Sequence, residues 1–157
     1  MVSRRPRACS TSSARGRKIG IVTWPKKYVP TETAKDLLDL VARLMPLLLA
    51  GDHATCFALR VQYARAQVRE VELTGVGFFV DFDIPSDAPR TEPKNMTGGS
   101  VEIRVEGVAN GAGCLLFVRD GVIAMLEGYT YDDAWPERPV VLALENPIPL
   151  VPSGSVG

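Results

Sequence analysis

The sequence predicts an α+β protein, in which two N-terminal helices pack on one face of an antiparallel sheet of about four to five strands, joined as a meander. Two observations predict this class. Apolar residues recur at steps of three and four between residues 31 and 68, as they do in amphipathic helices. From residue 68 to residue 144 the period changes to two, and Asp120-Gly121 marks a tight turn between two β-rich runs.

Length and composition indicate one domain. A chain of 157 residues, 46% of them hydrophobic, buries a sizeable core but is too short for two ordinary domains. The predicted boundaries are a basic accessory tail over residues 1–30, a single domain over 31–146, and a frayed end rich in Pro, Gly and Ser over 147–157. Met45 offers an internal start, so the sequence leaves open whether residues 1–44 belong to the native protein.

Charge divides the chain sharply at Pro30. Residues 1–30 hold eight of the 18 Lys and Arg residues and no acidic residue. The remaining ten basic residues stand against all 18 acidic ones, so the body carries a formal charge of −8. A negative body repels nucleic acid backbones and favours a basic protein as partner.

Cysteine usage and hydropathy favour a soluble, cytoplasmic protein without a cofactor or a membrane partner. Cys9, Cys56 and Cys114 are odd in number and lack metal-ligand spacing, so they predict reduced thiols, and the latter two should be buried. No run approaches the ~18 apolar residues of a membrane span. The sequence gives no indication of an oligomeric state.

The two helices are predicted from their capping residues and apolar stripes. The first should begin at Thr31, whose hydroxyl can cap it, and should kink or end at Pro46. Asp52 should cap the second. The stripe that should cover the sheet consists of Ala54, Phe57, Ala58, Val61, Ala64 and Val68. The opposite, polar side should hold Arg60, Gln62, Arg65, Gln67 and Arg69.

Further strands are predicted over residues 68–73, 76–84, 101–106 and 140–144. Asp81, Asp83 and Asp87 raise the question of a metal site, but their spacing lacks the glycine and the closing glutamate of a calcium loop. We interpret them as the solvent side of a strand and predict no metal. Residues 85–99 hold three prolines and form the longest predicted loop of the body.

A hairpin over residues 113–131 is the centre of the predicted sheet. Its first arm, residues 115–118, contains no charged residue, so both of its faces are expected to be covered. The second arm alternates, which places Val122, Ala124 and Leu126 on one face. The other face should hold Ile123, Met125, Glu127, Tyr129 and Tyr131, with Glu127 as its one carboxylate.

Candidate ligand-binding residues lie at the end of this hairpin: Glu127, Tyr129, Tyr131, Asp132 and Asp133. Tyrosines beside a carboxylate bind small polar ligands, or share a proton with it if burial raises the carboxyl pKa. The pattern also fits a structural role, in which the tyrosines pack on a helix and Glu127 accepts hydrogen bonds from their hydroxyls. His53, the only histidine, has no visible nucleophile or orienting acid and is interpreted as a turn residue. No catalytic residue is therefore predicted.

Four segments carry a resemblance: residues 49–53 (LAGDH), 74–79 (TGVGFF), 126–131 (LEGYTY) and Trp135-Pro136. Over roughly residues 47–138 the chain resembles small bacterial proteins of an uncharacterised family that end in a similar LEGYTY-then-WP segment. The resemblance implies no activity, because these proteins have no agreed function. It implies that the domain proper begins near Leu47 and that the preceding residues are accessory.

Two classes of function fit the sequence. The first is a non-catalytic interaction protein, such as an immunity or antitoxin-like protein, and the acidic body and the lack of a catalytic constellation favour it. The second is a small ligand-binding module or enzyme that uses the face of Glu127, Tyr129 and Tyr131.

Overall fold

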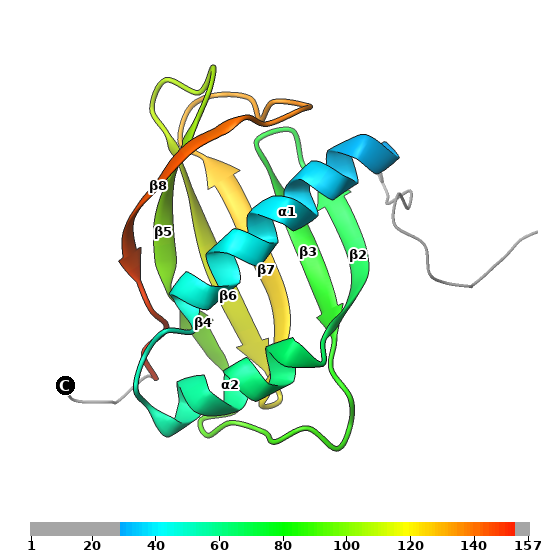
Figure 1. Cartoon of the computed structure of the whole chain (residues 1–157), viewed down its shortest axis with the longest axis vertical. Helices are drawn as coiled ribbons and strands as arrows, with labels where there is room; N and C mark the ends of the chain where they lie inside the picture. Colours follow the sequence, from blue (N-terminus) through cyan, green and yellow to red (C-terminus); the bar gives the residue numbers. More distant parts are fainter. Residues whose placement is uncertain (1–28, 153–157) are drawn as a thin grey trace, which may run out of the picture.

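The computed structural model describes residues 29–152, which form two helices on one face of a twisted sheet (Figure 1). The elements are α1 (Thr31–Leu48), α2 (Ala54–Ala64), β2 (Gln67–Leu73), β3 (Gly77–Asp83), β4 (Met96–Gly98), β5 (Ser100–Val105), β6 (Ala112–Arg119), β7 (Val122–Thr130) and β8 (Val141–Ile148). Every strand pair is antiparallel. The predicted α+β class, with two N-terminal helices on an antiparallel sheet, is confirmed.

The sheet is larger than predicted and is not a meander. It has seven strands, six of them in the order β2-β3-β7-β6-β5-β8, while β4 pairs with β6. Short turns join β2 to β3 and β6 to β7, and residues 106–111 join β5 to β6. After β3 the chain crosses to the far side of the sheet to form β4 and β5, and the β6–β7 hairpin then lies between β3 and β5.

Helix α1 crosses the sheet diagonally and supplies much of the core (Figure 1). Its N-cap is Pro30, so Thr31 is the first helical residue and not the predicted cap, and Pro46 lies inside the helix, which ends at Leu48. The helix residues that are buried are Thr33, Ala34, Leu37, Leu40, Val41, Leu44, Met45 and Leu48. Val29, just before the helix, is also fully buried. The expectation that the domain proper begins near Leu47 is therefore wrong.

Helix α2 turns a different side to the sheet from the one predicted. Its N-cap is His53, one residue after the predicted Asp52, and its buried residues are Thr55, Cys56, Leu59 and Gln62. Phe57, assigned to the covering stripe, is 64% exposed. The prediction failed because two polar residues on the buried side, Thr55 and Gln62, have hydrogen-bond partners in the loop over residues 84–95.

Two glycines allow β3 and β7 to pack closely beneath α1. The ring of Phe78 lies over Gly128, where a Cβ atom would come within 2.1 Å of that ring. The Trp135 ring packs edge-on against the Phe78 ring, with the two centroids 5.1 Å apart. At Gly77 a Cβ atom would come within 1.9 Å of the Gly128 carbonyl oxygen. Neither position can take a side chain without movement of its neighbours.

Gly128→Ala is expected to lower the free energy of unfolding by about 1–3 kcal/mol, because the added methyl group overlaps the Phe78 ring. Denaturant unfolding measures this loss. Phe78→Leu removes the obstructing ring atoms, so the double variant should lose less stability than the sum of the two single losses. Strictly additive losses would contradict the proposed overlap.

The chain beyond residue 146 is part of the ordered body as far as residue 152. Strand β8 extends to Ile148, and Leu150 is fully buried in the core. The Leu150 amide donates to the Leu48 carbonyl at 2.8 Å, which satisfies one of the free carbonyls at the end of α1. The predicted frayed end is thus wrong for residues 147–152, and residues 153–157 lie outside the described part.

The two cysteines within the described residues match their prediction, since Cys56 and Cys114 are buried free thiols. Burial raises the pKa of the Cys114 thiol to about 11. Cys9 and the basic tail, up to residue 28, lie outside the described part. No helix in residues 29–152 is long and apolar enough to cross a membrane.

Candidate functional site

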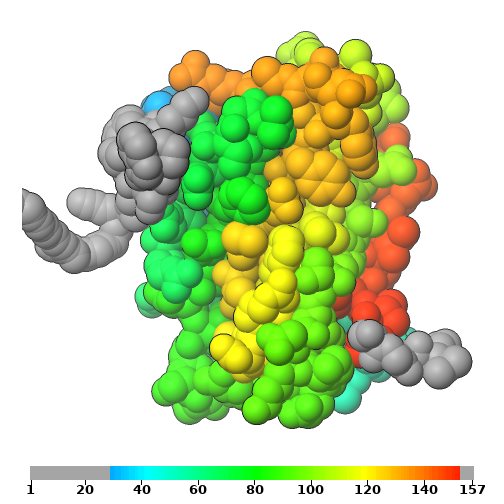
Figure 2. All heavy atoms as spheres, turned by 180° about the vertical axis from the view of Figure 1, so that it is seen from behind, coloured from blue at the N-terminus to red at the C-terminus, as the bar shows by residue number. Residues whose placement is uncertain are grey.

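The face of the sheet opposite the helices is not covered by any other element of the described chain (Figure 2). Antiparallel pairing sets its side chains in rows, because directly opposed residues share a face. One row reads Glu72, Phe79, Glu127 and Leu115, and the next reads Glu70, Asp81, Met125, Phe117 and Thr97. A third holds Tyr129 between Gly77 and Gly113. We call these three rows the open face.

The open face corrects two expectations about the hairpin. Leu115 and Phe117 lie on it half-buried, so the first arm is central but only one of its faces is covered. In β7 the register shifts between the pairs made by Phe117 and Val118, which leaves Ala124 as an extra residue. This bulge reverses the alternation, so Ile123 is fully buried on the helix side and not beside Met125.

Glu127 lies half-buried between two apolar cross-strand neighbours, Phe79 on β3 and Leu115 on β6. Within residues 29–152, its carboxylate has neither an ion-pair partner nor a hydrogen bond from a tyrosine hydroxyl. The structural alternative, in which Glu127 accepts from Tyr129 and Tyr131 while these pack on a helix, is therefore wrong. Tyr129 points away from both helices.

The two tyrosines meet above a glycine of the neighbouring strand. Their rings form an edge-to-face pair with centroids 5.7 Å apart. A Cβ atom at Gly113 would lie 3.0 Å from both hydroxyl oxygens, so the missing side chain makes room for them. Burial raises the pKa of the Tyr129 hydroxyl above its usual value, and the adjacent Tyr131 raises it further. Tyr131 itself is 57% exposed.

Asp132 and Asp133 lie after β7 and do not turn toward Glu127. The side-chain nitrogen of Asn110 donates to the Asp132 carboxylate at 3.2 Å, and the backbone amide of Asn110 donates to the Asp133 carboxylate at 3.4 Å. A shallow hollow of about 470 Å³ opens beside this loop, and among the candidate residues only Tyr131 lines it. The other lining residues include Glu102, Arg104, Asn110 and Glu145. The structure thus brings Tyr129 and Tyr131 together but does not gather all five candidates around one cavity.

The charges of the open face are unequal where it spans β2, β3 and β7. Four carboxylates of the three rows lie on this part, Glu70, Glu72, Asp81 and Glu127, and Asp83 follows Asp81 on the same side of β3. The one basic side chain that the described residues place among them is Arg69, which lies 3.6 Å from Asp81 and 3.5 Å from Asp83. Asp81 and Asp83 thus form the solvent side of β3, as predicted, but an arginine bridges them.

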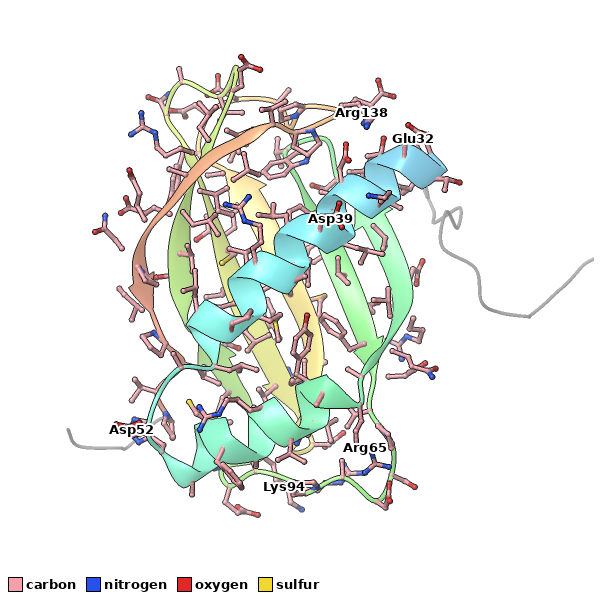
Figure 3. All side chains as sticks on the ribbon, viewed as in Figure 1. Glu32, Asp39, Asp52, Arg65, Lys94 and Arg138 are labelled. Atoms are coloured by element: carbon pink, nitrogen blue, oxygen red, sulfur yellow. The ribbon has the colours of Figure 1, made fainter. Side chains whose placement is uncertain are left out.

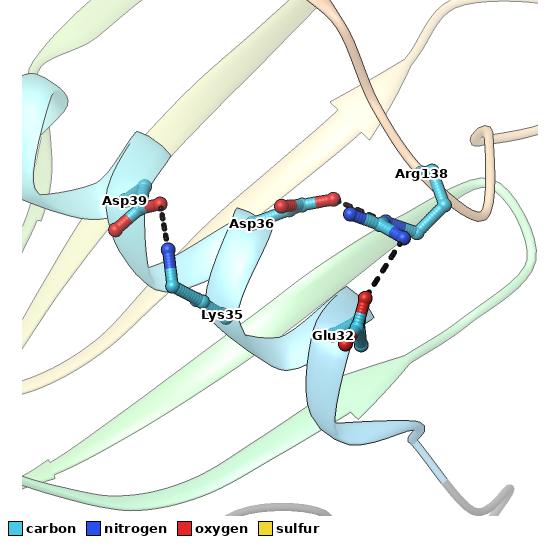
Figure 4. Close-up of polar contacts among 5 residues, drawn as sticks. All are labelled: Glu32, Lys35, Asp36, Asp39 and Arg138. Atoms are coloured by element: carbon cyan, nitrogen blue, oxygen red, sulfur yellow. Dashed lines mark hydrogen bonds and ion pairs between the residues drawn. The ribbon is translucent and has the colours of Figure 1, made fainter.

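On the helix side, by contrast, charges of both signs are interspersed (Figure 3). Arg138 lies between Glu32 and Asp36 of α1, at 3.2 Å and 2.5 Å from their oxygens, and Lys35 pairs with Asp39 at 3.1 Å (Figure 4). Acidic residues of α1 are therefore neutralised within the molecule. The carboxylates of Glu72 and Glu127 have no such partner among residues 29–152.

His53 and Cys56 are the pair of side chains that best resembles a base beside a nucleophile, because both lie next to Gly51. The Cys56 thiol donates to the Leu150 carbonyl at 3.2 Å, and burial raises its pKa, so it is held as a neutral thiol. This environment does not activate a nucleophile. Within residues 29–152, no group of three or more His, Cys, Asp or Glu side chains is placed to hold a metal ion.

No protein-family model, curated protein sequence or solved structure matches this chain. Sequence reasoning found Glu127, Tyr129 and Met125 on one face but missed Phe79, Leu115 and Phe117. The alternation over residues 76–84 places Phe79 on the same face as Asp81 and Asp83, but it does not show which strands lie beside that face. Only the pairing of β3 with β7 places Phe79 beside Glu127.

Proposed function

We propose that the protein is a non-catalytic interaction protein that binds a basic protein, in the manner of an immunity or antitoxin protein. The formal charge of −8 on residues 29–152 is the observation that carries this proposal. A charge of this size speeds the encounter with a positively charged partner and disfavours binding to nucleic acid. Part of it is not neutralised within the fold, since Glu72 and Glu127 lack ion-pair partners among these residues.

The second candidate is a small ligand-binding module at the Tyr129 and Tyr131 end of the sheet. The hollow beside Tyr131 favours it, because an exposed aromatic ring and two carboxylates, Glu102 and Glu145, line the same space. Glu145 is partly neutralised by Arg104 at 3.8 Å. A small ligand would raise the melting temperature at micromolar to millimolar concentration, whereas a protein partner would be found by selection from displayed sequences.

Selection of peptides from a random displayed library on the immobilised protein tests the proposed function. The enriched peptides should carry a net positive charge, and their binding should weaken by at least about tenfold between low and physiological salt, because the attraction is screened. Neutral or acidic enriched peptides, or binding that is insensitive to salt, would contradict the proposal. A library of the same length that lacks Lys and Arg serves as the control and should yield no binder.

A further inference from the structure

The geometry points to the open face as the docking surface for the basic partner, an inference that rests on the proposed function. The occupant that it fits is a segment of a protein in which Lys or Arg side chains stand beside apolar ones. Two properties of the face, its apolar centre and its unequal charge, lead to this occupant.

The apolar centre runs across three neighbouring strands. Phe79 on β3, Met125 on β7, and Leu115 and Phe117 on β6 are all half-buried, so each leaves part of its apolar surface in contact with solvent. Tyr129 continues the centre toward the end of the sheet. At the β6 side, the Arg119 guanidinium lies 5.2 Å from the Phe117 ring, so the part of the centre that fits a basic partner is the part toward β3 and β7. Contiguous exposed apolar and aromatic surface of this kind marks interaction sites.

The carboxylates lie on one side of this apolar centre and within it. Glu72 and Glu127 flank Phe79 in a single row, and Glu70 and Asp81 begin the row beside it. A lysine or arginine side chain laid along such a row contacts an aromatic ring with its stem or guanidinium group while its charge meets a carboxylate. The row therefore matches an arginine or lysine better than it matches a purely apolar segment.

Other exposed surfaces of the described chain fit this partner less well. Acidic residues of α1 already pair with Arg138 and Lys35. Edge strand β8 exposes Leu142 and Ile148, but register shifts break its pairing with β5, and Pro147 lacks an amide, so an incoming strand would not pair along it continuously. Phe57 on α2 is exposed, but the Arg60 guanidinium lies 5.9 Å from its ring, and α2 lies on the other side of the sheet from the acidic rows.

Two double variants of the full chain, matched in charge, test the location. Glu72→Gln/Glu127→Gln removes two charges from the open face, and Asp52→Asn/Glu92→Gln removes two exposed charges near α2. The probe is the synthetic peptide Lys-Trp-Lys-Trp-Lys, with Glu-Trp-Glu-Trp-Glu as the control peptide. The open-face variant should bind the lysine peptide about fivefold to tenfold more weakly than the parent, and the α2 variant should bind it within about twofold of the parent.

Changes in the backbone amide chemical shifts, measured by NMR during the same titration, give a second, independent readout. The shifts should concentrate on β3, β6 and β7, and melting temperatures should show that both variants are folded. Equal weakening by the two variants, or shifts confined to α1, α2 or β8, would overturn the docking surface while leaving a basic partner in place. If the parent binds the lysine and glutamate peptides equally, the proposed function itself is wrong.

Discussion

A chain that begins at Met45 is expected not to fold. It would lack Leu37, Leu40 and Leu44, whose side chains are at most 2% exposed in the core. Burial of one such leucine contributes about 1.5–3 kcal/mol, and typical domains have only about 5–15 kcal/mol of net stability. Without these core side chains of α1, the chain should show no cooperative unfolding transition when it is heated and followed by circular dichroism.

A chain that begins at Val29 is the matched control. It keeps all of α1 and the buried Val29 side chain and removes only the basic tail. Its melting temperature should lie within a few degrees of that of the full chain. A cooperative transition for the chain from Met45 would show that the sheet is stable without α1, contrary to the packing described above.

Gln62→Leu is expected to lower the free energy of unfolding by about 2–4 kcal/mol, because it leaves buried polar groups without partners. The Gln62 side chain is fully buried. Its amide nitrogen donates to the Pro89 carbonyl at 2.7 Å and the Gly121 carbonyl at 2.8 Å, and its oxygen accepts from the Ile123 amide at 2.8 Å. One side chain thus ties α2 to the long loop and to the β6–β7 turn.

Gln67→Leu provides the control, since Gln67 is exposed on β2 and the same substitution there should change stability by no more than about 0.5 kcal/mol. Chemical denaturation of both variants measures the difference. Hydrogen exchange should show faster exchange at Ile123 in Gln62→Leu than in the parent. Similar stabilities of the two variants would mean that the buried hydrogen bonds contribute little.

The candidate site was partly predictable from the sequence. Alternation along β7 is enough to place Met125, Glu127 and Tyr129 on one face, because side chains of a strand point alternately to opposite sides. The neighbour of Glu127 on β3 was not predictable, since β3 and β7 lie far apart along the sequence. The bulge at Ala124 was also not visible, because Ile123 is as apolar as the residues on either face.

Local chemistry in the sequence determined the class of the fold. Periods of 3.6 and 2 separate helices from strands, and Asp120 and Gly121 adopt the positive φ values, 54° and 82°, that the hairpin turn requires. The same patterns located α1, both buried thiols and the division of charge at Pro30. These features depend on residues close together in the chain, so sequence alone is sufficient for them.

Tertiary structure alone decided the order of the strands, the side of α2 that is buried and the occupation of the two sheet faces. Gln62 counts as polar in any sequence pattern, yet it is buried because carbonyls of the long loop and of the β6–β7 turn come within reach of its amide. Leu150 is buried because its backbone amide donates to a carbonyl at the end of α1, which brings its side chain among the core side chains. Each of these outcomes depends on groups that meet only after the chain has folded, which is why periodicity did not reveal them.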